Sequence, residues 1–157
     1  MRLLFVCMGN ICRSPAAEGV MKHQLAEAGL LSKVEVDSAG TINLHAGNPP
    51  DSRMTASAAK RGIQLVHRAR QVTAQDLADF DLILVMDKEN LRDVRQLDRT
   101  DQYDSKIKLF CDYTSHHSQI EVPDPYYGGP AGFELVLDLL EDGCANLVKQ
   151  VQSPSQG

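Results

Sequence analysis

A cysteine and an arginine lie close together near the start of the chain, at Cys7 and Arg13, within the sequence CMGNICRS. A thiolate can attack phosphorus, successive backbone N–H groups can bind phosphate oxygens, and a guanidinium can bind two of those oxygens at once. A helix N-terminus and a nearby cation also favour the thiolate form of a cysteine. The segment therefore predicts a cysteine-dependent phosphatase that forms a phosphocysteine on Cys7.

The residues around this pair form the expected phosphate-binding loop, which would turn its backbone N–H groups toward the substrate. Gly9 is expected to adopt backbone angles that other residues resist. Ser14 is expected to cap the following helix, with Pro15 at the first helical position. The loop residues beside Cys7 and Arg13 are Met8, Gly9, Asn10, Ile11, Cys12 and Ser14.

A second candidate segment, Pro123 to Gly129, carries an acid between two prolines. The leaving group of a phosphate ester needs a proton, and we expect Asp124 to donate it. In the second half of the reaction the same carboxylate would take a proton from water. Tyr126 and Tyr127 offer aromatic walls for a flat substrate.

Other reactive side chains have simpler interpretations. Cys111 and Cys144 are expected to be core thiols, because Cys144 falls on an apolar helical stripe and Cys111 follows a predicted strand. His116-His117 is interpreted as a solvated loop pair, and Arg68 and Arg70 as a solvated face. The cysteines are not spaced as a disulfide framework or a zinc site, which fits a reducing cytoplasm. Neither a metal nor a cofactor is expected.

Length and composition favour one domain over residues 1–157, with residues 152–157 as a frayed tail. Sixteen basic and 21 acidic residues give a formal net charge of −5, which argues against nucleic-acid or membrane-surface binding. No apolar stretch reaches the roughly 18 residues of a membrane span, and no leader pattern precedes the first strand. We expect a cytoplasmic monomer.

Strands alternate with helices along the chain, and this pattern predicts a parallel sheet of about four strands with helices on both faces. The carboxyl ends of such strands share one edge, where ligands bind, and Cys7 follows the first strand. Strands are expected at 3–6, 34–40, 80–86 and 107–110. Helices are expected at 15–28, 51–61, 88–97 and 131–151, with a short one capped by Thr73.

Five segments in order resemble the motifs of the low-molecular-weight protein tyrosine phosphatase family: 6–15, 37–41, 67–73, 86–87 and 124–128. The resemblance covers essentially the whole chain. It implies a three-layer α/β/α fold whose parallel sheet has the order 2-1-3-4, with the phosphate-binding loop between the first strand and the first helix. It also implies a metal-free hydrolase of phosphotyrosine in proteins and of aryl phosphates, with phosphate, sulfate or vanadate as anions in the site.

The resemblance assigns catalytic roles to three residues. Cys7 would be the nucleophile, Arg13 would bind phosphate and stabilise the transition state, and Asp124 would donate the proton. The second loop cysteine, Cys12, would pair reversibly with Cys7 under oxidation. Such a disulfide would protect Cys7 from irreversible over-oxidation.

The resemblance also implies supporting residues. Ser14 would donate a hydrogen bond to the Cys7 thiolate. Asn10 would brace the loop through an internal hydrogen-bond network with the help of Ser38 and His67.

One position departs from the family pattern. Leu44 stands where family members often carry a large aromatic residue. The expected substrate wall is then Met8, Ile11, Leu44, Tyr126 and Tyr127, and the sequence preference around phosphotyrosine stays open.

Three alternatives remain. An arsenate reductase of this fold would need further cysteines to relay a disulfide, and here only Cys111 and Cys144 are left. A phosphoarginine phosphatase of this fold would carry threonine where Ile11 stands, whereas an apolar side chain suits a phenyl ring. A phosphate-binding module without activity would not need Asp124.

Overall fold

The computed structural model describes residues 1–153. Gln152 ends the last helix, so the expected tail begins no earlier than Ser153. The rest of that tail, residues 154–157, lies outside the described residues.

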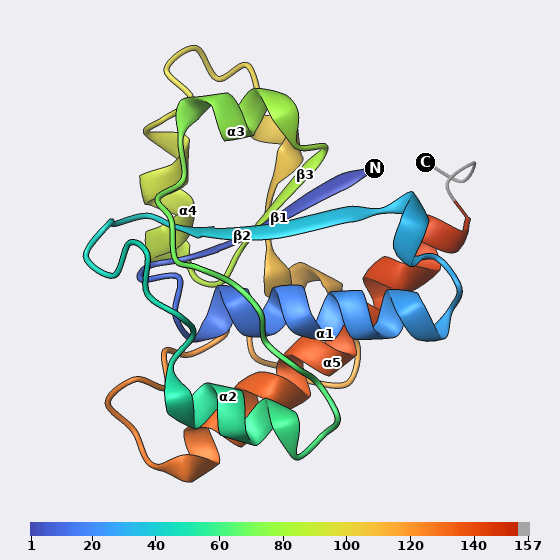
Figure 1. Cartoon of the computed structure of the whole chain (residues 1–157). Helices are drawn as coiled ribbons and strands as arrows, with labels where there is room; N and C mark the ends of the chain where they lie inside the picture. The colour runs from blue at the N-terminus through green and yellow to red at the C-terminus, as the bar shows by residue number, and fades with distance from the viewer. Residues whose placement is uncertain (154–157) are drawn as a thin grey trace.

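The central sheet has four parallel strands in the order β2-β1-β3-β4. They are β1 (Arg2–Cys7), β2 (Glu35–Gly40), β3 (Leu82–Val85) and β4 (Ile107–Leu109). Figure 1 shows β1 inside the sheet, with the loop that follows it near the left edge of the view. The predicted strand order is confirmed.

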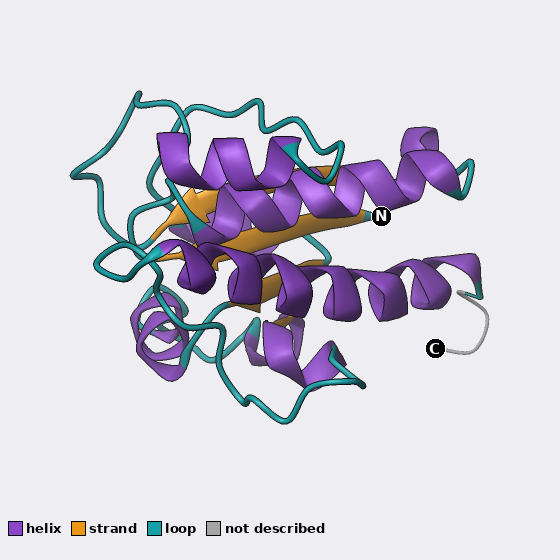
Figure 2. Ribbon diagram, turned by 90° about the horizontal axis from the view of Figure 1, so that it is seen from below, coloured by secondary structure: helices purple, strands orange, loops and turns teal. Residues whose placement is uncertain are grey.

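Helices cover both faces of the sheet, as predicted (Figure 2). The α-helices are α1 (Arg13–Glu27), α2 (Ser52–Ala59), α3 (Ala74–Asp79), α4 (Lys88–Arg95) and α5 (Pro130–Gln152). Short 3-10 helices occur at Leu31–Lys33, Asp104–Lys106 and Phe110–Tyr113.

The side chains of β1 alternate between two cores. Leu3 and Phe5 pack in the core that contains buried residues of α1, α2 and α5. Leu4 and Val6 pack in the other core, with buried residues of α3 and α4. Both faces of β1 are therefore covered, which explains its continuous apolar sequence.

Two predicted helix starts have different outcomes. Thr73 caps α3 and forms a reciprocal capping box with Asp76, as expected. The expected cap at Ser14 is wrong, because α1 begins at Arg13 and Ser14 lies buried within its first turn. The Ser14 hydroxyl points to the phosphate-binding loop instead, as described below.

The expectation of a solvated pair at His116-His117 is wrong for His117. Its Nδ1 lies 2.7 Å from a carboxylate oxygen of Asp142, whose side chain is buried in α5. The backbone N–H groups of Ser115 and His116 donate to the same carboxylate. Burial alone would raise the pKa of Asp142, but these hydrogen bonds outweigh it and lower the pKa to about 2.

The expectation of a solvated face is wrong for Arg70. Its guanidinium binds Asp37 of β2 and Asp76 of α3, with N···O distances of 3.1 and 2.9 Å. Arg68, by contrast, is exposed as expected. Arg70 therefore joins the edge strand of the sheet to a helix that packs on it.

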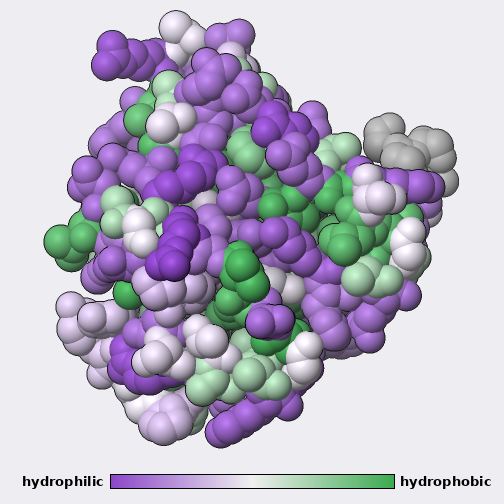
Figure 3. All heavy atoms as spheres, viewed as in Figure 1, coloured by the Kyte–Doolittle hydropathy of each residue, from purple (hydrophilic) through white to green (hydrophobic). Residues whose placement is uncertain are grey.

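The molecular surface in Figure 3 is mostly hydrophilic, and hydrophobic side chains appear on this face in separate groups. Within residues 1–153, no helix combines the length and apolar character needed to cross a membrane. Four of the large apolar side chains that are exposed, Met8, Ile42, Leu44 and Tyr127, line the same cavity. This cavity is the candidate active site.

Candidate active site

The phosphate-binding loop lies at the carboxyl edge of the sheet. Cys7 is the last residue of β1 and Arg13 is the first residue of α1. The loop backbone rests against the end of β2, where a Cβ atom on Gly40 would lie 2.6 Å from the carbonyl oxygen of Met8. Glycine is therefore required at position 40, because any side chain would push the loop away.

The unusual backbone conformation in this loop occurs at Asn10, whose φ is +58°. The expectation that Gly9 would supply it is wrong, since Gly9 does not adopt a positive φ. Asparagine is one of the residues that tolerate the left-handed region. Gly9 leaves space for a neighbour instead: a Cβ there would lie 3.1 Å from the His45 ring.

The Asn10 side chain makes four hydrogen bonds inside the protein. Its amide nitrogen donates to the hydroxyls of Ser14, at 2.8 Å, and Ser38, at 3.0 Å. Its oxygen accepts from the backbone N–H of Arg70, at 2.9 Å, and faces His67 Nε2 at 2.8 Å. The structure thus brings Ser38 and His67 together with Asn10, as expected. The backbone of Arg70 also binds Asn10, and this contact was not predicted.

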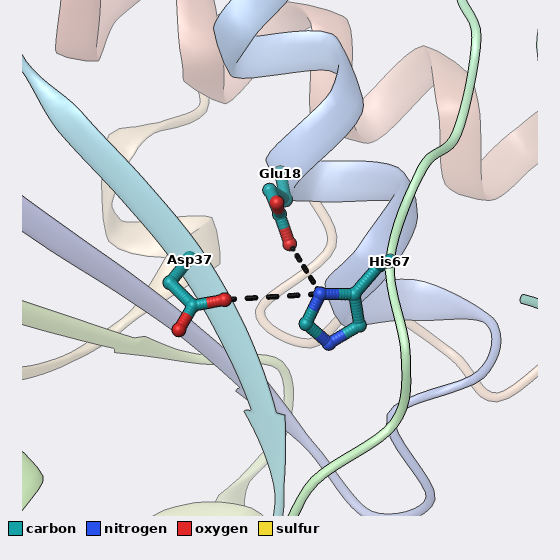
Figure 4. A group of neighbouring side chains, drawn as sticks. All are labelled: Glu18, Asp37 and His67. Carbon is teal, nitrogen blue, oxygen red and sulfur yellow. Dashed lines mark ion pairs between the residues drawn. The ribbon is translucent and has the colours of Figure 1, made fainter. Parts of the chain in front are cut away.

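Three ionisable side chains from α1, β2 and the segment before α3 meet behind the loop (Figure 4). His67 Nδ1 lies 3.1 Å from Glu18 and 3.7 Å from Asp37. Its Nε2 faces the Asn10 oxygen, so both ring nitrogens have partners within the protein. The cluster therefore connects the loop to α1 and β2 through the His67 ring.

Glu18, which was not predicted as a site residue, connects this cluster to the rest of the site. Its carboxylate is buried and accepts hydrogen bonds from Ser38, at 2.8 Å, and Lys22, at 2.7 Å. The only signal in the sequence is an acid on the same face of α1 as the apolar Met21 and Leu25. Its partners Ser38 and His67 lie far away in the chain. Ser38 and His67 are therefore both held by Glu18 and in turn hold Asn10.

The Cys7 sulfur lies at the base of the loop. Its Sγ is 3.0 Å from the Ser14 hydroxyl and 3.3 Å from the backbone nitrogen of Asn10. The sulfur therefore lies within hydrogen-bonding distance of one hydroxyl and one backbone N–H of the loop.

Arg13 is almost completely buried at 3% exposure. Its Nη1 donates to Asp87 at 2.6 Å and to the Val122 carbonyl at 3.1 Å, while Nη2 lies 3.7 Å from Asp124. Burial alone would lower the pKa of Arg13, but Cys7 and Asp87 outweigh it and raise the pKa. The guanidinium is therefore always charged and held in place.

Asp87 was not predicted as a site residue. It follows β3 at the carboxyl edge of the sheet and also caps α4 by accepting from the N–H of Asn90. Its place directly after a buried strand is a signal that could have identified it.

A cavity of about 150 Å³ opens above the loop. Asp124 lies at its wall, and one of its carboxylate oxygens accepts from the backbone N–H of Tyr126 at 3.0 Å. All five expected wall residues line the cavity, and Ile42 and His45 join them without having been predicted. The five expected wall residues are Met8, Ile11, Leu44, Tyr126 and Tyr127.

Other cysteines are held as neutral thiols. Burial, with smaller effects of Asp51 and Cys7, raises the pKa of Cys12 to about 12. Burial likewise raises the pKa of Cys111 to about 11, and it raises that of Cys144 further. Cys111 and Cys144 are both buried, as expected for core residues.

Comparison with known proteins agrees with this geometry. The sequence model of the family described as low molecular weight phosphotyrosine protein phosphatase matches residues 2–156. The chain is 57% identical over 148 residues to the Synechocystis protein slr0328, covering 94% of each chain. It is 42% identical over 155 residues to the low molecular weight protein-tyrosine-phosphatase YfkJ of Bacillus subtilis, covering 98% of this chain and 97% of YfkJ.

A solved structure of a protein tyrosine phosphatase from Entamoeba histolytica superposes with a TM-score of 0.94 at 46% identity, covering 99% of both chains. Fold and sequence together therefore define a phosphoric monoester hydrolase. The chain belongs to the low molecular weight phosphotyrosine protein phosphatase family.

Proposed function

We propose that this enzyme hydrolyses phosphotyrosine in proteins, and small aryl phosphates, through a phosphocysteine intermediate. The observation that carries the proposal is the meeting of Cys7, Arg13 and Asp124 in one cavity, although 111 positions separate the arginine from the acid. Each residue type matches one requirement of the reaction: a nucleophile, a dianion clamp and a proton donor.

In the first step the Cys7 sulfur attacks phosphorus, so that an S–P bond forms and the bond from phosphorus to the tyrosine oxygen breaks. Asp124 gives its proton to the departing oxygen. Arg13 and the loop N–H groups bind the three phosphoryl oxygens, where negative charge is concentrated in the transition state.

In the second step water attacks the phosphorus of the intermediate. Asp124, now ionised, accepts a proton from that water, the S–P bond breaks and inorganic phosphate leaves. The thiolate of Cys7 is restored with its hydrogen bond from Ser14. Phosphate, sulfate and vanadate should all bind in the same loop, and no metal or cofactor takes part.

Cys12 is a poor nucleophile at neutral pH, because its pKa is raised to about 12. This supports Cys7 as the attacking sulfur. Cys12 would instead form a reversible disulfide with Cys7 after oxidation, which keeps Cys7 from advancing to irreversible acids.

The apolar wall supports phosphotyrosine as the substrate class. Ile11 and Tyr126 offer flat or aliphatic surfaces to a phenyl ring. A structure described as drosophila arginine phosphatase also superposes, with a TM-score of 0.90 at 32% identity, so phosphoarginine is kept as a second candidate. An arsenate reductase is disfavoured, because buried Cys111 and Cys144 are unsuited to relaying a disulfide.

We further propose that residues 1–157 form one phosphatase domain that acts as a monomer in the cytoplasm. The largely hydrophilic face in Figure 3 supports a monomer. Four free cysteines are consistent with a reducing compartment.

The test is steady-state hydrolysis of matched peptides that carry phosphotyrosine, phosphoserine or phosphoarginine, with EDTA present. We expect rapid phosphate release from phosphotyrosine alone. A preference for phosphoarginine would contradict the argument from Ile11. Absence of turnover on all three would favour arsenate reduction or a binding role, and arsenate-dependent thiol consumption would separate those two.

A further inference from the structure

Arg53, in the first turn of α2, is outside the cavity lining; its side chain is half-exposed and is paired with the residue before the helix. The carboxylate of Asp51 accepts from the Arg53 backbone N–H at 2.8 Å, from Nε at 3.2 Å and from Nη2 at 3.0 Å. The guanidinium is therefore held by a two-pronged pair, a geometry that lysine cannot reproduce.

Asp51 also joins this pair to the phosphate-binding loop. Its backbone N–H donates to the carbonyl oxygen of Ile11 at 2.7 Å. The carboxylate that binds the Arg53 guanidinium therefore belongs to a residue whose backbone is anchored on the phosphate-binding loop.

On its other side the guanidinium contacts the segment that carries the proton donor. Its central carbon lies 5.2 Å from the ring centre of Tyr126 and 4.9 Å from that of Phe133 in α5. Both distances are within the range of cation–π attraction. The Tyr126 backbone N–H in turn donates to the Asp124 carboxylate at 3.0 Å.

We propose that Arg53 is a positioning residue for proton transfer, because it links Asp51 at the phosphate-binding loop to Tyr126 and so fixes Asp124 at the cavity. This inference rests on the proposed function, in which Asp124 protonates the leaving group. A direct role in binding phosphate is disfavoured, since the Asp51 carboxylate already occupies the guanidinium fork.

Arg53→Met tests the proposal, because methionine keeps an apolar stem and removes the charge and the fork. For aryl phosphates with weakly acidic leaving groups, which need the proton most, we expect kcat/KM to fall about tenfold. For a strongly acidic leaving group such as p-nitrophenol we expect less than about a twofold change. Arg53→Lys keeps a cation near the rings, so its loss of kcat/KM with weakly acidic leaving groups should be smaller than that of Arg53→Met.

Arg92→Met is the matched control, because Arg92 is an exposed arginine of α4, away from the cavity lining. It should leave the dependence on the leaving group unchanged. The second readout is the backbone amide resonance of Tyr126 in ¹⁵N-labelled protein, which should shift in Arg53→Met and stay in place in Arg92→Met.

The proposal requires both changes. It would be overturned if kcat/KM of Arg53→Met depended on the leaving group as in the unaltered enzyme, or if the Tyr126 amide resonance did not move. A rise in KM that is the same for all leaving groups would indicate that Arg53 binds substrate directly. If the unaltered enzyme hydrolyses no aryl phosphate, the proposed function is wrong. The Tyr126 amide resonance would then still show whether Arg53 holds the segment that carries Asp124.

Discussion

Replacement of Asn10 by alanine should destabilise the whole protein and not only its active site. The side chain makes four hydrogen bonds to buried or half-buried partners, and each such bond contributes about 0.5–1.5 kcal/mol. Their sum is about 4 kcal/mol, a large share of the roughly 5–15 kcal/mol by which a protein of ordinary stability is folded.

The backbone at this position adds a second, separable effect. Asn10 has a φ of +58°, a region that costs a residue with a Cβ about 1–2 kcal/mol but costs glycine little. Asn10→Ala should therefore be less stable than Asn10→Gly by about 1 kcal/mol, although glycine makes no more hydrogen bonds than alanine.

Urea unfolding followed by circular dichroism measures both differences. Asn43→Ala is the control, because Asn43 is an exposed asparagine in the loop beside the cavity, and its replacement should change the free energy of unfolding by less than about 0.5 kcal/mol. A loss below about 1 kcal/mol for Asn10→Ala would refute the hydrogen-bond argument. An alanine variant as stable as the glycine variant would refute the argument from φ.

Further predictions concern the chemistry and the pH dependence. Cys7→Ser should abolish turnover yet bind phosphate with similar affinity in calorimetry, and appreciable residual turnover would show that another group attacks phosphorus. Asp124→Asn should slow poor leaving groups by about 100-fold or more and acidic ones least, whereas equal losses across a series of aryl phosphates would argue against proton donation. Peroxide should inactivate the enzyme and a dithiol should restore it; in Cys12→Ser recovery should fall, and mass spectrometry should then find over-oxidised Cys7. The pKa of Asp142 is lowered to about 2 in the folded protein, so its carboxylate stabilises the fold above the unfolded value near 4, and that contribution is lost as pH falls through 2. Asp142→Asn should consequently cost about 2 kcal/mol at pH 7 and much less at pH 2 in urea unfolding, and a pH-independent cost would contradict this linkage.

Much of the fold could be predicted because its signals are local. The apolar sequence of β1 and the Thr73 capping box each lie within a few neighbouring positions. Cys7 and Arg13 were identifiable for the same reason, since a loop between a buried strand and a helix has a short, distinctive sequence.

The missed residues are those whose partners are distant in the chain. Asp87 pairs with Arg13 across 74 positions, and Glu18 receives the Ser38 hydroxyl from 20 positions away. Spacing between charged residues does not distinguish such pairs from solvated ones; only the place of Asp87 after a buried strand could have identified it. The error at Gly9 has another cause, because glycine and asparagine both tolerate positive φ and stand side by side here.

The hydrogen bonds of Arg13 also have a consequence for how the enzyme is made. This side chain, near the start of the chain, is held by Asp87 and by the carbonyl of Val122, which lies 109 positions later. During synthesis Arg13 therefore acquires these partners only after most of the polypeptide has been made. A nascent chain that already carries Cys7 would lack Asp124 and this clamp, so recovery of activity in a refolding experiment should report the last stage of folding and not the first.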